Sequence, residues 1–92
     1  MEKNITIEKI RKYRQLTEKA LKIARKNIVR GKEKEAKEIT EMVSNYLSDS
    51  EYFEKKEDYV SAFAAINYSH GWLDCGARLK IFNVKDKKLF TV

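Results

Sequence analysis

Residues that interrupt helices or bind soft metals are scarce in this sequence. Its 92 residues include no proline, three glycines, one cysteine and one histidine. Because proline and glycine are the strongest helix breakers, their scarcity favours long helices. The single cysteine, Cys75, excludes a disulfide within the chain and is typical of a reducing compartment.

Long apolar runs are missing as well. No stretch approaches the ~18 consecutive apolar residues that indicate a transmembrane helix, and the first residues lack the apolar region and cleavage site of a signal peptide. The sequence therefore predicts a cytoplasmic protein with no membrane partner. A chain of 92 residues is just long enough for one hydrophobic core, so we expect a single domain over residues 1–92.

Apolar residues recur at helical spacing in three segments. Thr6 and Asp58 are residue types that cap helix N-termini, and Gly31 is a natural stop for the first segment. Short connections between the segments favour antiparallel neighbours. The sequence predicts an all-α fold, an antiparallel up-down-up three-helix bundle with helices over about residues 6–30, 33–55 and 58–82 and a short extended tail over 83–92.

The third segment is the least charged long stretch of the chain. Two apolar stripes run along it at helical spacing, and a helix with two stripes must be covered on more than one side. We therefore expect this helix at the centre of the bundle, with Phe63, Ile66 and Leu73 buried. Gly71 and Gly76 lie inside it, and each costs about 1 kcal/mol relative to alanine.

The charge is distributed unevenly. Residues 1–37 hold 13 Lys and Arg against 5 Asp and Glu, a net charge of +8, although the whole chain carries +6. Such an asymmetry is typical of a nucleic-acid face or of a solvated, charge-rich surface. The residues of the first helix that would contact nucleic acid are Arg11, Lys12, Lys19, Lys22 and Lys26, with Arg14 and Arg25 at the border of the same arc.

Residues that could carry chemistry are few. His70 and Asp74 lie one helical turn apart, but Cys75 points about 100° away from Asp74, and the sequence has no second histidine or cysteine to complete a metal site. There is no glycine-rich phosphate loop and no nucleophile-elbow pattern. We therefore expect no metal, no cofactor and no catalytic residue, and a small enzyme is the least favoured of three alternatives.

Several exposed positions favour an interaction role. Asn67 and Tyr68 fall between the two apolar stripes of the third helix, and Leu89 and Phe90 make the tail apolar. These four residues are the candidates for an interaction surface with a protein partner or in a homodimer. The first hypothesis is thus a protein-protein interaction or self-association module. The second is a nucleic-acid-binding accessory domain that uses the basic residues of the first helix.

The passage from the second segment into the third carries a family resemblance. Its elements are Tyr52-Phe53, Asp58-Tyr59-Val60, the alanine-rich stretch 62–65, and Gly71-Trp72-Leu73-Asp74. In these elements the chain resembles the archaeal family catalogued as domain of unknown function 357, whose members tend to have glycine where this chain has Glu57. The resemblance implies a three-helix bundle. It implies no catalytic or binding residue, because the role of the family is uncharacterised.

Overall fold

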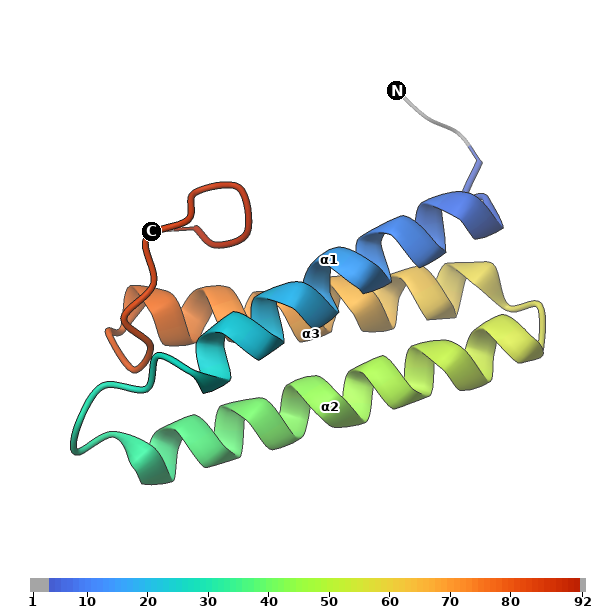
Figure 1. Cartoon of the computed structure of the whole chain (residues 1–92). Helices are drawn as coiled ribbons and strands as arrows, with labels where there is room; N and C mark the ends of the chain where they lie inside the picture. Colours follow the sequence, from blue (N-terminus) through green and yellow to red (C-terminus); the bar gives the residue numbers. More distant parts are fainter. Residues whose placement is uncertain (1–3, 92) are drawn as a thin grey trace.

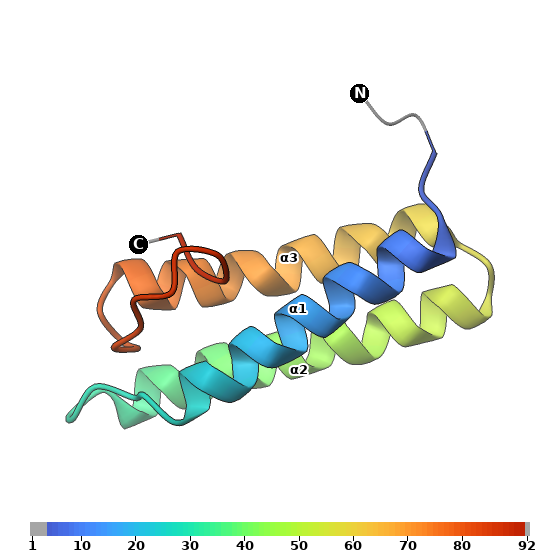
Figure 2. The ribbon, with the colours of Figure 1, turned by 45° about the horizontal axis from the view of Figure 1, so that its top comes forward.

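A computed structural model describes residues 4–91 of the chain. Three helices, α1 (Ile7–Arg25), α2 (Glu33–Lys55) and α3 (Tyr59–Arg78), alternate in direction along a bundle (Figure 1). α3 packs against both other helices and most extensively against α2, whereas α1 and α2 share the fewest contacts. Figure 2 shows the bundle from the side on which α1 lies over the other two helices. The predicted all-α three-helix bundle is confirmed.

Two of the helices begin at side-chain caps. The Thr6 hydroxyl accepts a hydrogen bond from the backbone N–H of Lys9 at 3.1 Å, and the Asp58 carboxylate accepts one from the N–H of Ser61 at 3.1 Å. Each cap satisfies a backbone donor that the helix itself leaves unpaired. The caps that the sequence predicts at these two positions are therefore present.

α1 ends earlier than predicted, at Arg25 instead of about residue 30. The next residues are extended and pair with the segment that follows α3. The N–H of Val29 donates to the carbonyl of Ile81 at 2.9 Å, and the N–H of Asn83 donates to the carbonyl of Asn27 at 2.7 Å. These bonds take residues 27–29 out of the helix, and Gly31, with φ of 91°, lies in the loop beyond them.

α2 and α3 end with left-handed residues that are not glycine. Glu57 has φ of 59° and Lys80 has φ of 60°. In the Schellman arrangement the residue after the left-handed one donates its N–H to the carbonyl five residues back. Asp58 donates to Phe53 at 2.9 Å and Ile81 to Gly76 at 2.9 Å. α3 therefore stops at Arg78, and the predicted extension to residue 82 is wrong.

The hydrophobic core lies mainly between α2 and α3. Ile66 and Leu73 are fully buried, as expected, but Phe63 is only partly buried, with its ring edge-on to exposed Tyr13 at a centroid distance of 5.5 Å. The larger of two core clusters joins the helices to the segment after α3. Its buried members are Ala20, Leu21, Ala24, Ala36, Ile39, Val43, Leu47, Leu73, Ala77, Ile81, Phe82, Leu89 and Phe90.

The two glycines of α3 have opposite surroundings. A Cβ atom on Gly76 would lie 2.5 Å from Cε2 of Phe82, closer than packed atoms allow, and 3.2 Å from Cδ1 of Ile39, which is a tight contact. A Cβ atom on Gly71 would meet nothing within 4 Å. The absence of a side chain at Gly76 is therefore required by packing, whereas nothing in the described chain requires it at Gly71.

The tail is not extended, contrary to the prediction. After residue 83 it loops back onto the bundle (Figure 1), and Leu89 and Phe90 are buried, with 4% and 3% of their surface exposed. The backbone N–H of Thr91 donates to the Asp74 carboxylate at 2.9 Å. The tail of the described chain is thus part of the core. None of the helices in residues 4–91 combines the length and hydropathy needed to cross a membrane.

The contrast between the glycines gives a paired prediction. Gly76→Ala should lower the free energy of unfolding by about 1–3 kcal/mol, because the new methyl group overlaps the Phe82 ring. Gly71→Ala should raise it by about 0.5–1 kcal/mol at low protein concentration, because alanine favours the helix and meets open space. Urea unfolding followed by circular dichroism measures both, and changes of the same sign would contradict this packing.

Candidate functional site

One side of α3 is exposed and carries a single charged residue, Arg78, at its C-terminal end. It is formed by side chains that recur every three or four residues, and we call it the outer face of α3. Its members are Val60, Ala64, Tyr68, Gly71, Cys75 and Leu79. The three largest, Val60, Tyr68 and Leu79, are 70%, 62% and 63% exposed. The opposite side of the same helix holds the buried positions, so α3 is apolar around most of its circumference.

Tyr68 is the aromatic centre of this face. Its ring packs on that of Tyr46 of α2, with centroids 4.9 Å apart, so the exposed tyrosine is supported from below. A shallow hollow of about 350 Å³ lies beside it, lined by Tyr68, Gly71, Trp72 and Cys75. The buried Trp72 Nε1 has no hydrogen-bond partner among residues 4–91. Buried donors are seldom left unpaired, which marks this region as unusual.

The four predicted interaction residues separate into two groups. Asn67 and Tyr68 are exposed, as expected. Leu89 and Phe90 are covered by the chain's own core and offer no surface to a partner in this structure. The apolar residues of the tail indicated that the tail is buried. The sequence alone did not show whether it is buried against this chain or against another molecule.

His70 and Asp74 hold the tail in place. His70 Nε2 donates to the carbonyl of Leu89 at 2.6 Å, and Nδ1 lies 3.0 Å from the Thr17 hydroxyl of α1. The two carboxylate oxygens of Asp74 accept from the N–H and the hydroxyl of Thr91. Both ring nitrogens are therefore engaged. Within residues 4–91 no group of three potential ligands could hold a metal ion.

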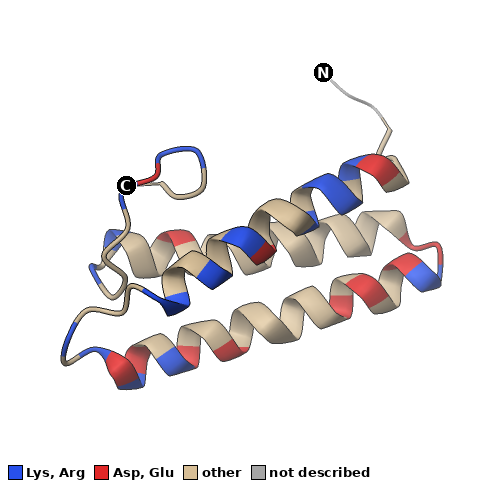
Figure 3. Cartoon of the chain, in the orientation of Figure 1, with Lys and Arg blue, Asp and Glu red and all other residues tan. Residues whose placement is uncertain are grey.

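The basic residues of α1 are arranged largely as predicted. The basic face of α1, which is Arg11, Lys12, Lys19, Lys22 and Lys26, is exposed, and Figure 3 shows the Lys and Arg positions recurring along α1. Arg11 pairs with Glu54 of α2 at 3.2 Å. The four lysines form no ion pair with any residue in the described range.

Arg14, which the sequence places at the border of that arc, is instead buried between α1 and α2. Its Nε donates to the Ser50 hydroxyl at 3.0 Å, and one terminal nitrogen donates to the Glu54 carboxylate at 2.7 Å. Ser50 in turn donates to the carbonyl of Leu47. Arg14 therefore joins two helices and does not contribute to the basic face of α1.

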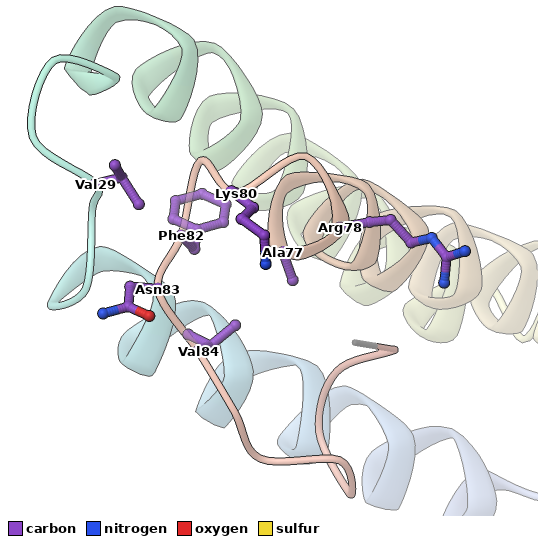
Figure 4. Close-up of a pocket in the computed structure, with 7 residues that line it drawn as sticks. All are labelled: Val29, Ala77, Arg78, Lys80, Phe82, Asn83 and Val84. Carbon is purple, nitrogen blue, oxygen red and sulfur yellow. The ribbon is translucent and has the colours of Figure 1, made fainter.

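Two hollows are lined by cations. One is an open groove of about 570 Å³ between α1 and α2, where Arg25 donates to the Ser44 hydroxyl at 2.9 Å. Its other lining residues include Lys22, Lys26, Glu18 and Glu51. The second hollow, of about 270 Å³, lies beside the end of α3 and has the Phe82 ring among its walls (Figure 4). It is lined by Val29, Ala77, Arg78, Lys80, Phe82, Asn83 and Val84.

Comparison with known proteins identifies the family. A family model described as protein of unknown function (DUF357) matches residues 12–82. The chain belongs to the DUF357 family. No curated protein and no solved structure matches it. The DUF357 match includes the whole outer face of α3 and the four lysines of α1, but it ends before the tail that contains Leu89 and Phe90.

The backbone conformation of Glu57 bears on the resemblance to the DUF357 family. The resemblance implies glycine at this position, where the present chain has a left-handed residue with φ of 59°. Glycine adopts that conformation without the steric cost that a Cβ atom brings. The Schellman turn between α2 and α3 therefore gives a physical reason for the glycine preference, and the present chain makes the same turn with glutamate.

The Arg14–Glu54 contact makes stability depend on pH. The hydrogen bond from Arg14 lowers the pKa of Glu54 below its ordinary value of 4.5, with burial opposing the shift and Arg11 reinforcing it. Because the folded-state pKa is the lower one, Glu54 stabilises the fold fully above pH 4.5. That contribution is lost as the pH falls through the lowered folded-state pKa.

Glu54→Gln should therefore flatten the fall in stability on acidification. We expect the free energy of unfolding of the variant to change less than that of the wild type between about pH 6 and pH 3. Urea titrations at both pH values measure the difference. Glu51→Gln, an exposed change on the same helix, is the matched control. If the two variants showed the same pH profile, Glu54 would not carry this dependence.

Proposed function

We propose that this protein is a protein-protein interaction module whose contact surface is the outer face of α3. One observation carries the proposal: α3 exposes a face whose one charged residue is Arg78 at its C-terminal end, in a chain of which 37% of residues are charged. Figure 3 shows α3 almost free of charged positions, with α1 and α2 charged along much of their length. An exposed helix side is normally covered by charged and polar residues, and an apolar one tends to mark an interface.

The support beneath this face strengthens the proposal. Tyr68 rests on Tyr46, so an exposed aromatic ring is held in place before any partner arrives. Aromatic residues are enriched at interfaces, where a rigid ring contributes contact area at little cost in side-chain entropy. A binding role also fits better than a catalytic one, because His70 and Asp74 are occupied in holding the tail.

Position-dependent photo-crosslinking tests the proposal. A benzophenone amino acid at Tyr68 or at Leu79 should form protein adducts in the cells that naturally make the protein, including adducts with a second copy. The control position is Asn45, which is exposed on α2. Adducts at both α3 positions and none at Asn45 are expected. Equal adducts at all three, or none on α3, would overturn the assignment.

The basic face of α1 supports a second candidate function, binding of nucleic-acid backbone. Its four lysines point to solvent without ion-pair partners in the described chain, and the groove beside Lys22 and Lys26 adds the Arg25 guanidinium and the Ser44 hydroxyl. Cations and hydroxyl donors along several helical turns can contact successive phosphates. Among the aromatic residues only Tyr13 is on α1, so such binding should be electrostatic and tolerant of sequence.

Charge reversal tests this second candidate. Replacing all four lysines of the basic face by glutamate should abolish binding to labelled duplex DNA and RNA, measured by fluorescence anisotropy. Wild-type affinity should fall with salt, with a log–log slope of roughly 0.9 per phosphate contact on duplex DNA. No wild-type binding at low salt would exclude this function.

The matched control reverses four exposed lysines of the α2 region, so the net charge changes by the same amount. They are Lys34, Lys37, Lys55 and Lys56. If both variants lost binding equally, the total charge of the protein and not the basic face of α1 would explain the affinity.

A further inference from the structure

The outer face of α3 is symmetric in its spacing. Its six members follow one another at intervals of four, four, three, four and four residues, which read the same in both directions, whereas exposed Asn67 and Arg78 of the same helix fall outside this pattern. The centre of this pattern lies between Ser69 and His70. A second α3 that crosses antiparallel at that centre would therefore bring the residues of the two faces to matching heights along the helix axes. It would set Val60 opposite Leu79, Ala64 opposite Cys75, and Tyr68 opposite Gly71.

The sizes of the paired residues are complementary. Tyr68 is the largest residue of the face and would lie over the partner's Gly71, where this chain leaves open space around the missing side chain. Ala64 and Cys75 are both small, so the two helix backbones can approach closely on either side of the centre. Close approach over small residues, with a large side chain filling the remaining hollow, is how helices pack with native density.

The charges at the ends of α3 are complementary in the same orientation. The N-terminal end of the helix is flanked by exposed Glu57 and Asp58, and the C-terminal end carries exposed Arg78 and Lys80. An antiparallel crossing brings the acidic end of one copy to the basic end of the other, twice. A parallel crossing would instead place like charges together. It would also bring the like ends of the two helix dipoles side by side, which is less favourable than the antiparallel arrangement.

We propose that a second copy of this chain is the partner of the outer face of α3, in an antiparallel homodimer in which Tyr68 of each copy covers Gly71 of the other. This inference rests on the proposed function and names the occupant of the same surface. A single helix pair covers less area than the roughly 800 Å² per partner of a standard interface. We therefore expect a dissociation constant of about micromolar or weaker.

Cysteine cross-linking tests the orientation. In the antiparallel dimer Ala64→Cys lies opposite Cys75 of the other copy, so mild oxidation should yield a disulfide-linked dimer. The two Cys75 residues would be eleven positions apart along the axis, or about 16 Å at 1.5 Å per residue, which is too far for a disulfide. Wild type, with Cys75 alone, and Ala64→Cys combined with Cys75→Ser are therefore single-cysteine controls that should stay monomeric on a non-reducing gel. Equal cross-linking in either control, or none in Ala64→Cys, would overturn the antiparallel register.

Light scattering across a concentration series tests the association itself. Wild type should approach twice the monomer mass of 10.9 kDa at high concentration. Gly71→Leu fills the hollow that receives Tyr68, so we expect its dissociation constant to rise at least about tenfold while circular dichroism shows unchanged helix content. Wild type that stays monomeric, or Gly71→Leu that dimerises equally well, would overturn the proposal. Adducts from Tyr68 to a different protein would then leave the interaction module standing with another partner.

Discussion

The packing of the Phe82 ring against the backbone of Gly76 is the contact on which much of the remaining structure depends. The ring occupies the space that any side chain at position 76 would fill. To reach it, the chain must turn back sharply after Arg78, and the left-handed Lys80 makes that turn. The return brings residues 81–83 beside residues 27–29, where backbone hydrogen bonds end α1. One aromatic contact therefore fixes the ends of two helices.

The packing of α1, α2 and the tail determines which side of α3 remains free. α2 covers the small positions of the helix, α1 covers a second side, and the tail closes the end through His70 and Asp74. What is left is a strip that the described chain leaves largely exposed. A helix of such low charge would be unsurprising if it were buried all round. Its apolar exposure is informative because the other two helices follow the usual division into a buried and a charged side.

Local signals in the sequence predicted some features well. Thr6 and Asp58 act on backbone groups three residues away, so their capping roles can be read directly from sequence. The end of α1 could not be predicted, because it depends on bonds to residues more than fifty positions later. Helical spacing alone would have continued α1 to Gly31.

The candidate surfaces were predictable to different degrees for the same reason. Lysines on the side of α1 away from its apolar stripe must point to solvent, so the basic face followed from spacing. Arg14 lies on the border of that arc, and its burial depends on Ser50 and Glu54 of another helix. Leu89 and Phe90 have no periodic context at all. Their apolar character predicts that they are buried. Only the path of the tail, which returns to the bundle, shows that they are buried within this chain.

Of the two glycines of α3, the packing of the chain requires Gly76 but does not require Gly71. Each should weaken the helix by about 1 kcal/mol relative to alanine. At Gly76 that cost is offset within the chain, because Phe82 and Ile39 fill the space. At Gly71 the described chain provides no compensation, although the residue lies near the centre of the exposed outer face of α3. A cost that stability does not explain is expected where a surface is shaped for binding, and this is a reason to propose the interaction surface on α3 instead of on the charged helices around it.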